Sequence, residues 1–270
     1  MSAFESGRRL CLLFEAGACR FAVEATAVTE VATPDEDGRT LRGALELRDL
    51  SHLLGAGDEE RPGMAVVLDV SPTLAIRVRR VREVVDVARD RHFGIPPVLG
   101  ESVAFVTRGA ILHDNQLFFE LKPEAIPHEP FRHVGPLPRT VYLLDRPPDR
   151  ALVFESQGVL FGMPLALVSQ VVGASDSFLP TPADSGPVAG VFPHAQSLWP
   201  VFSVPALLGG RAAKEALIVL AELAGEAVGL AASRVVGVVS AFEPTVGRGE
   251  FTARGSDRAI LFLDLQRMFS

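Results

Sequence analysis

Short hydrophobic runs separated by turn-forming residues recur along the whole chain. Leu10–Phe14 and Arg20–Val23 flank a glycine-containing turn, a pattern that predicts a β-hairpin. Further strand pairs are predicted at Leu152–Phe154 with Val159–Met163, Met64–Val70 with Leu74–Val78, and Ala216–Leu223 with Ala227–Ala231. Leu45–Gly55 and Val201–Gly209 each predict a strand that runs into a short helical turn ended by glycine. Helical periodicity is scarce, and Ala25–Ala32 favours about one and a half helical turns. The pattern predicts a mainly β protein.

The chain contains an internal repeat. A shift of 140 residues places Leu12–Ala32 on Leu152–Val172 without a gap, with identical residues at several positions, Glu15 and Glu155 among them. Three further segments match in the same order: Leu53–Gly55 with Leu207–Gly209 at a shift of 154, Arg82–Val87 with Ser233–Val238 at 151, and Leu117–Leu121 with Leu261–Leu265 at 144. Because the segments keep one order in both halves, we interpret the chain as two diverged copies of one domain.

A proline-rich stretch separates the two copies. Pro123–Pro148 holds seven prolines, and proline fixes φ and lacks an N–H donor, so no regular element is expected there. We predict a first domain at residues 9–126, a connector at 127–149 and a second domain at 150–270. Within the connector, Thr140–Asp145 is apolar enough to pack on a neighbour. The first copy is shorter than the second between Val31 and Thr40, which predicts the loss of one strand.

Composition excludes several functional classes. The chain of 270 residues carries 26 basic and 33 acidic residues, a net charge of −7, which disfavours general nucleic-acid binding. Its two cysteines, Cys11 and Cys19, cannot build a disulfide framework, and we predict two buried hydrophobic side chains, with Cys19 facing Phe14 across the hairpin. Neither a signal peptide nor a membrane-spanning run is recognisable, so a cytoplasmic location is expected.

A serine nucleophile is the one catalytic hypothesis that the motifs offer. Ala183–Val188, with Ser185 at its centre, resembles the nucleophile loop of double-barrel serine proteases. However, that chemistry needs a histidine base held by a buried aspartate and an oxyanion pocket shaped by glycines. We therefore interpret the segment as a turn and keep the serine hydrolase as an alternative. The six histidines have no metal-ligand spacing, and no phosphate-binding glycine loop is present. We predict a protein that is not an enzyme, without cofactor or metal.

The ordered segments, found twice, resemble the CheW-like domain of bacterial chemotaxis. The resemblance rests on the opening hairpin, then Val28-Thr-Glu30-Val31 and its copy Val168-Ser-Gln170-Val171, then Thr40-Leu-Arg42-Gly43 and its counterpart Val188–His194. Next come a strand that ends at Asp49, or at Ser203 in the second copy, and a closing apolar strand. The resemblance implies an all-β fold in which each domain consists of two small five-stranded β-barrels, here duplicated in tandem.

The same resemblance implies a function by contact. Such domains are adaptors that dock on the regulatory domain of a chemotaxis-type histidine kinase and on the cytoplasmic tip of chemoreceptors, or on other motility proteins, at membrane-associated arrays without inserting into the membrane. It implies an interface at Glu30, Val31, Arg42, Gly43, Asp49, Gln170, Val171 and His194. The first copy keeps Glu30 and Arg42, where the second has Gln170 and His194. A divergent scaffold for motility or polarity proteins, without kinase coupling, is the second hypothesis.

Overall fold

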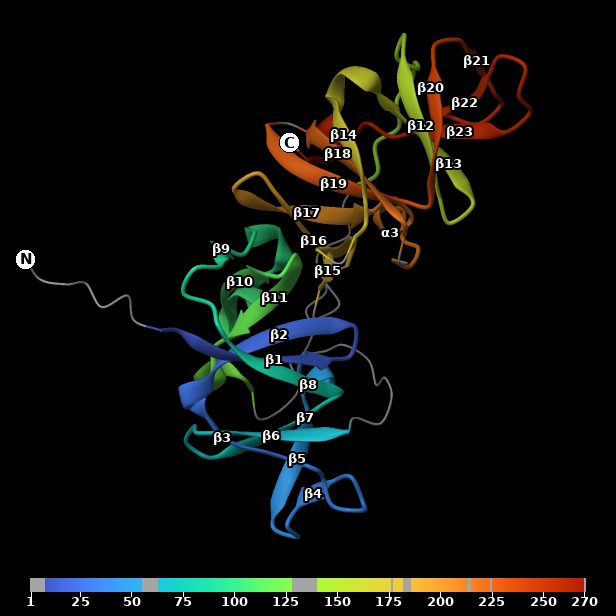
Figure 1. Cartoon of the computed structure of the whole chain (residues 1–270). Helices are drawn as coiled ribbons and strands as arrows, with labels where there is room; N and C mark the ends of the chain where they lie inside the picture. Colours follow the sequence, from blue (N-terminus) through green and yellow to red (C-terminus); the bar gives the residue numbers. More distant parts are fainter. Residues whose placement is uncertain are drawn as a thin grey trace, which may run out of the picture. The chain divides into compact units, whose positions relative to one another are not determined.

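A computed structural model of the chain describes residues 8–54, 63–127, 140–175, 177–181, 186–212, 215–223 and 225–269. Strands predominate in these residues and helices are short, which confirms the mainly β class (Figure 1). The chain forms two compact units. Unit 1 is Met1–Gly135 with Asp176–Ser185 and Pro193–Leu198, and unit 2 is Pro136–Ser175 with Gly186–Phe192 and Trp199–Ser270.

The first half of the chain folds into two sheets. The larger has the order β8-β1-β2-β11-β10-β9, built from Arg80–Asp86, Leu10–Ala16, Cys19–Glu24, Gln116–Leu121, Thr107–His113 and Arg91–Phe93. The smaller has the order β3-β6-β7-β5-β4, built from Val28–Ala32, Met64–Leu68, Leu74–Val78, Leu45–Asp49 and Thr40–Leu41. Inward-facing side chains that alternate along these strands form two small cores, one around Leu13 and Phe118 and the other around Leu47 and Val67.

The second half has the same plan. One sheet has the order β20-β12-β13-β23-β22-β21, built from Arg234–Val239, Ala151–Ser156, Val159–Pro164, Ala259–Phe262, Glu250–Ala253 and Phe242–Pro244. The other has the order β14-β18-β19-β17-β16-β15, built from Val168–Gly173, Leu217–Leu223, Glu226–Ala232, Ser197–Ser203, Val188–His194 and Leu179–Pro180. The described helices are α1 Leu50–Leu53, α2 Glu101–Val106, α3 Val204–Leu207 and α4 Leu265–Phe269, with single 3-10 turns η1 Ala25–Ala27, η2 Pro97–Leu99, η3 Pro123–Ala125 and η4 Leu165–Leu167.

Strand register shows which residues of the two halves are equivalent. Phe14 pairs with Val81, and Phe154 pairs with Val235, so β8 and β20 correspond at a shift of 154 and the predicted 151 is wrong. In the parallel pairs, Phe21 lies beside Phe119 and Phe161 beside Leu261, a shift of 142 in place of the predicted 144. A register irregularity recurs between β1 and β8 and between β12 and β20, and another between β3 and β6 and between β14 and β18. The two halves therefore share their β-bulges as well as their strand order.

The two halves differ by one strand, as the sequence predicts. In the continuously described stretch from β3 to β4 there is no strand, whereas β15 lies between β14 and β16. The small sheet of the first half accordingly has five strands, and the other three sheets have six, one more than the expected five.

Two local predictions are wrong. Ala25–Ala32 is a single 3-10 turn, Ala25–Ala27, followed by strand β3, because the pairing of Val28–Ala32 with β6 outweighs a weak helical period. Cys19 lies opposite Ala16, and Phe14 lies opposite Phe21, because the turn is tighter than expected and Glu15 continues β1. Both cysteines are buried, as predicted.

The described part of the connector packs on the second half. The Leu144 amide donates to the Phe262 carbonyl over 3.0 Å, and the Asp264 amide donates to the Tyr142 carbonyl over 2.8 Å. The Arg267 guanidinium lies 4.0 Å from the centre of the Tyr142 ring. The predicted packing of Thr140–Asp145 is confirmed. Residues 128–139 of the connector, and Ser185 of the hydrolase hypothesis, lie outside the described residues.

Candidate protein-interaction sites

Two of the predicted interface residues meet in the first half. Glu30 lies on β3 and Arg42 follows β4, and these strands are the opposite ends of the small sheet. Arg42 Nη2 lies 2.6 Å from Glu30 Oε1, with the Arg42 side chain 75% and the Glu30 side chain 30% exposed. The curl of the sheet therefore brings together two charged residues that are twelve positions apart in the chain.

Asp35, which the sequence-based reasoning did not select, holds the backbone of the Arg42–Gly43 turn. Its carboxylate accepts hydrogen bonds from the Gly43 amide at 2.7 Å, the Arg42 amide at 3.0 Å and the Thr40 hydroxyl at 2.8 Å. Arg42 and Gly43 both have positive φ, 55° and 66°, a conformation that non-glycine residues rarely adopt. The bonds from Gly43, Thr40 and Arg42 keep the pKa of Asp35 below its ordinary value. Asp35 stands in the turn-forming run Pro34–Gly38, the signal that could have revealed it.

Asp49 serves the fold at the end of β5. Its Oδ1 accepts from the His52 amide at 3.1 Å, which caps α1, and its Oδ2 lies 3.2 Å from Arg77 Nη2. Ser203 occupies the equivalent position in the second half and accepts from the Ala206 amide at 3.4 Å, which caps α3. Ser203 therefore keeps the helix cap that Asp49 provides in the first half, but it cannot form the ion pair that Asp49 forms with Arg77.

The two halves share one ion-pair position, which is buried in the first half and half-buried in the second. Glu15 on β1 is bound by Arg79 and Arg82, and its equivalent Glu155 on β12 is bound by Arg234 at 2.8 Å and Arg258 at 3.0 Å. Burial raises the pKa of Glu15, but the hydrogen bonds and charges of Arg79 and Arg82 outweigh it and leave that pKa below its ordinary value. The recurrence of this glutamate in the repeat therefore has a structural reason. Glu15 ties β8 to β1 through Arg82, and Glu155 ties β20 to β12 through Arg234.

Exposed valines recur at equivalent positions in the two halves. Val31 on β3 is 39% exposed and its equivalent Val171 on β14 is 37% exposed. Val84 on β8 is 53% exposed and Val238 on β20 is 49% exposed. All four lie on strands that end their sheets. Gln170, beside Val171, is exposed, whereas His194 ends β16 and is half-buried.

The family of the second half follows from its sequence. A family model of the CheW-like domain matches residues 150–270. This half is a CheW-like domain. The crystal structure of the scaffolding protein TtCheW from Thermoanaerobacter tengcongensis is similar at 21% identity, covering 52% of this chain and 93% of that chain, with a TM-score of 0.38. No curated protein matches the chain.

The match confirms the resemblance that the sequence indicates. It covers residues 150–270, the second of the two predicted copies. The first half has the same strand order and the same two bulges as this CheW-like domain, with one strand fewer. The chain therefore contains one matched CheW-like domain and a divergent half that shares its topology.

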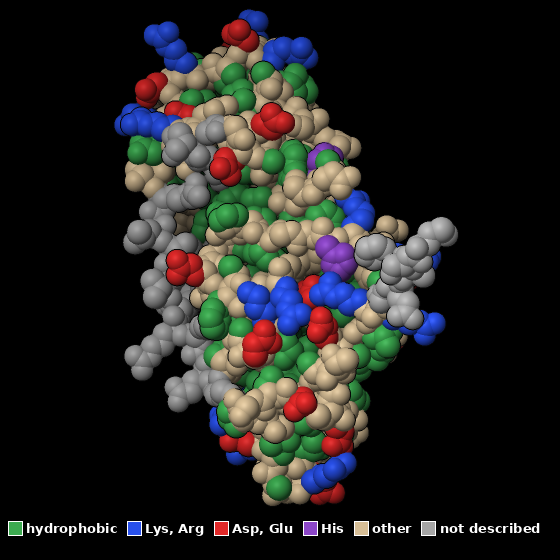
Figure 2. All heavy atoms as spheres, turned by 90° about the vertical axis from the view of Figure 1, so that its left-hand side faces the viewer, with side chains coloured by type: hydrophobic (Ala, Val, Ile, Leu, Met, Phe, Trp, Pro, Cys, Tyr) green, Lys and Arg blue, Asp and Glu red, His purple; other side chains and the backbone are tan. Residues whose placement is uncertain are grey.

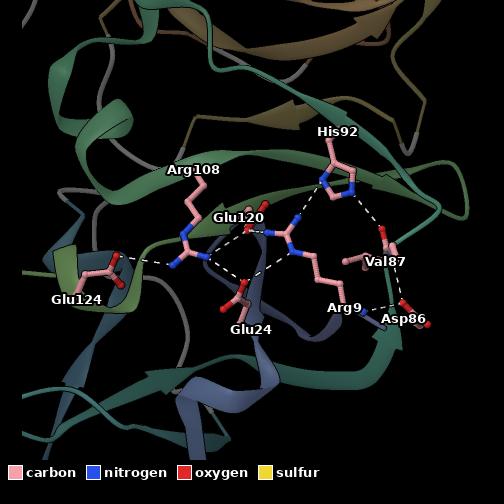
Figure 3. A network of polar contacts seen from close by, with 9 residues as sticks. Arg9, Glu24, Asp86, Val87, His92, Arg108, Glu120 and Glu124 are labelled. Carbon is pink, nitrogen blue, oxygen red and sulfur yellow. Dashed lines mark hydrogen bonds and ion pairs between the residues drawn. The ribbon is translucent and has the colours of Figure 1, made fainter. Parts of the chain in front are cut away.

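A network of charged residues distinguishes the first half from the CheW-like domain of the second. Glu120 on β11 is only 5% exposed and is paired with Arg9, while Arg108 on β10 lies 3.0 Å from Glu24 and 3.7 Å from Glu124 (Figure 3). At the shift of 142 that the register establishes, the counterpart of Glu120 is Phe262. Sequence comparison missed this because it aligned the closing strands two residues apart.

Within the described ranges, no group of three or more His, Cys, Asp or Glu side chains is arranged to hold a metal ion. In the same residues, no helix has the length and apolar character needed to cross a membrane.

Proposed function

We propose that the chain is a non-catalytic adaptor that couples chemoreceptors, or other signalling proteins, to a chemotaxis-type histidine kinase. The observation that carries the proposal is the pair of exposed valines repeated in both halves, Val31 with Val84 and Val171 with Val238. Hydrophobic side chains that stay exposed at equivalent positions of two diverged halves, on strands that end their sheets, support a role in docking. The match of residues 150–270 to the CheW-like domain supports a partner of the chemotaxis class.

The edge strands suit a reversible contact. Full burial of a valine side chain is worth about 1.5 kcal/mol or more, so a few such contacts support a transient complex. An edge strand also offers unpaired backbone groups to a partner strand. On the face that Figure 2 shows, basic and acidic side chains lie intermixed and hydrophobic side chains are exposed between them. Such a surface favours a protein partner over a polyanion.

The two halves offer surfaces of different charge. The edge strand β8 has the sequence Arg-Val-Arg-Glu-Val-Val-Asp, whereas β20 has Arg-Val-Val-Gly-Val-Val. Beside the exposed valine of β3 lies the Glu30–Arg42 ion pair, whereas β14 carries the neutral Gln170. We propose that the two halves bind different partners, the first through a charged rim and the second through an apolar edge.

Co-purification with a chemotaxis-type kinase and with a receptor cytoplasmic fragment tests the proposal. We expect the full chain to retain at least one of these partners, E30R to weaken binding at the first half, and V171D together with V238D to weaken it at the second. S185A is the matched control and leaves binding unchanged. Retention of neither partner by the full chain contradicts kinase or receptor coupling and favours the divergent scaffold.

Reaction with a fluorophosphonate probe tests the hydrolase alternative. A serine nucleophile activated by a base would be labelled, and S185A would abolish the label. We expect no labelling of the full chain. A label that depends on Ser185 would overturn the assignment as an adaptor.

A further inference from the structure

A short segment of the second half belongs to unit 1. Residues 177–181, here called the strap, include β15 and lie against the hairpin ends of the first large sheet. Arg20 Nη2 donates to the Phe178 carbonyl over 2.7 Å, and Cys19 Sγ donates to the carbonyls of Pro180 and Thr181, both at 3.3 Å. The strap is therefore held mainly through its backbone oxygens.

A further contact holds the start of the strap, and its middle is buried. The Ser177 hydroxyl donates to the Asn115 carbonyl, in the turn between β10 and β11, over 3.0 Å. Leu179 is completely buried. Arg91 on β9 donates to the Ala195 carbonyl of the neighbouring segment of unit 1. Backbone oxygens bound by side chains of the first half, together with one buried leucine, match the way in which an extended peptide is held, through its main chain and through pockets for some of its side chains.

The repeat provides an internal comparison for this surface. Cys19 lies opposite Ala16 and Val159 lies opposite Ser156 in hairpins of the same register, so Cys19 and Val159 are equivalent. Cys19 is 4% exposed, whereas Val159 is 45% exposed. Because the strands are equivalent, the difference comes from what covers them: the strap covers Cys19. In the first half, the fully described stretch between β3 and β4 has no strand equivalent to β15.

We propose that the strap is an internal ligand that occupies, in the intact chain, a binding site for an extended peptide on the first half. The site recognises backbone carbonyls through Arg20 and Cys19 and takes a leucine-sized side chain at the position of Leu179. A partner segment of this chemistry binds only when the strap leaves, so the contact is autoinhibitory. This inference does not depend on coupling to a kinase and can fail or hold independently of it.

The two cysteines provide separate reporters, since they are the only thiols in the chain. Cys19 reports on the strap, whereas Cys11, with no exposed surface, reports on the folding of the large sheet. We expect iodoacetamide, with mapping of the modified residues by mass spectrometry, to label neither thiol rapidly in the unaltered chain. L179D should speed the labelling of Cys19 by at least an order of magnitude while Cys11 stays protected. V159C, at the equivalent uncovered position, is the reference for rapid labelling.

A peptide added to the strap variant completes the test. A synthetic peptide of residues Ala174–Gly186 should restore protection of Cys19 in L179D, and the same peptide carrying L179D should not. Labelling of Cys19 as fast as that of V159C in the unaltered chain, or a peptide that gives no protection, overturns the proposal. If L179D also exposes Cys11, the variant R20L, which carries the residue of the second half at this position, takes its place: faster labelling of Cys19 alone supports the strap, and an unchanged rate overturns it.

Discussion

Gly162 and Phe262 lie side by side on the parallel strands β13 and β23, and a methyl group at Gly162 would overlap the Phe262 ring. The equivalent positions in the first half are Ala22 and Glu120, which are also paired. The ring of Phe262 has edge contacts with Phe242 and Phe251, with ring centres 5.1 and 5.6 Å apart. One half therefore fills this place with an aromatic cluster that requires glycine, and the other with a buried carboxylate beside alanine.

G162A is expected to destabilise the CheW-like domain of the second half by about 1–3 kcal/mol, because the added methyl displaces the Phe262 ring from its well-packed site. The single tryptophan, Trp199, is buried in unit 2, so its fluorescence during urea unfolding reports on this half. The matched variant A22G should leave the Trp199 transition unchanged. An unaltered midpoint for G162A would show that the ring has room to move.

Replacement of Glu120 by alanine is expected to destabilise the first half by about 1.5–3 kcal/mol, because Arg9 then loses its hydrogen bond to a buried carboxylate. Protection of Cys11 against alkylation in urea is the measurement, since Cys11 is buried in the same sheet. The double variant A22G/E120F, which installs the pair of the second half, should recover part of the loss, because the phenylalanine ring fills the space that E120A leaves empty. Equal protection in E120A and the unaltered chain would contradict a stabilising role for the network.

The Asp35 hydrogen bonds are expected to persist to unusually low pH. The folded pKa of Asp35 is depressed below 3.8, so its contribution is fully present above that pH and is lost as the pH falls through the lower folded value. The amide resonances of Arg42 and Gly43 should therefore shift below pH 3.8 in the unaltered chain. In D35N they should be displaced already at neutral pH and show no such titration. A midpoint above 3.8 would contradict the hydrogen bonds described.

The Glu30–Arg42 pair is expected to add little stability. A double-mutant cycle with E30A and R42A should give a coupling of about 0.2–1 kcal/mol that shrinks in high salt, since Arg42 is largely exposed. E30R should weaken partner binding more than it lowers the stability of the fold. The exchanged pair E30R/R42E should restore the coupling energy without restoring the binding. Restored binding would show that only the pairing, and not the position of each charge, matters to the partner.

Hairpins were the elements most accessible from the sequence. The opening hairpin, its copy and the turn at His113–Gln116 all combine hydrophobic strands with residues that favour positive φ, and Asp114 and Asn115 have φ of 44° and 61°. The missing strand of the first half was also predictable, because eight residues cannot supply a strand and its turns where twenty can. The structure of Ala25–Ala32 was not predictable, because it depends on the pairing of β3 with β6, which lies more than thirty residues later in the chain.

The candidate site was only partly predictable. Glu30 and Arg42 could be selected as individual residues, but their contact depends on the curl of a sheet whose terminal strands they occupy. Asp35 and Glu120 act through partners that no local motif reveals, such as the amides of a turn and an arginine 111 residues away. The cover over Cys19 comes from a segment about 160 residues later in the chain.

By itself, the sequence determined that this protein is a duplication of one β domain and that its second copy is CheW-like. The order of hydrophobic segments and turns is sufficient for that, because each strand fixes its own alternation of inward and outward residues. The tertiary structure alone decided which residues are equivalent and which meet. In a run such as Val235–Val239, a slip of two or three residues leaves an equally hydrophobic match, and only pairing with Phe154 in one register fixes the true one.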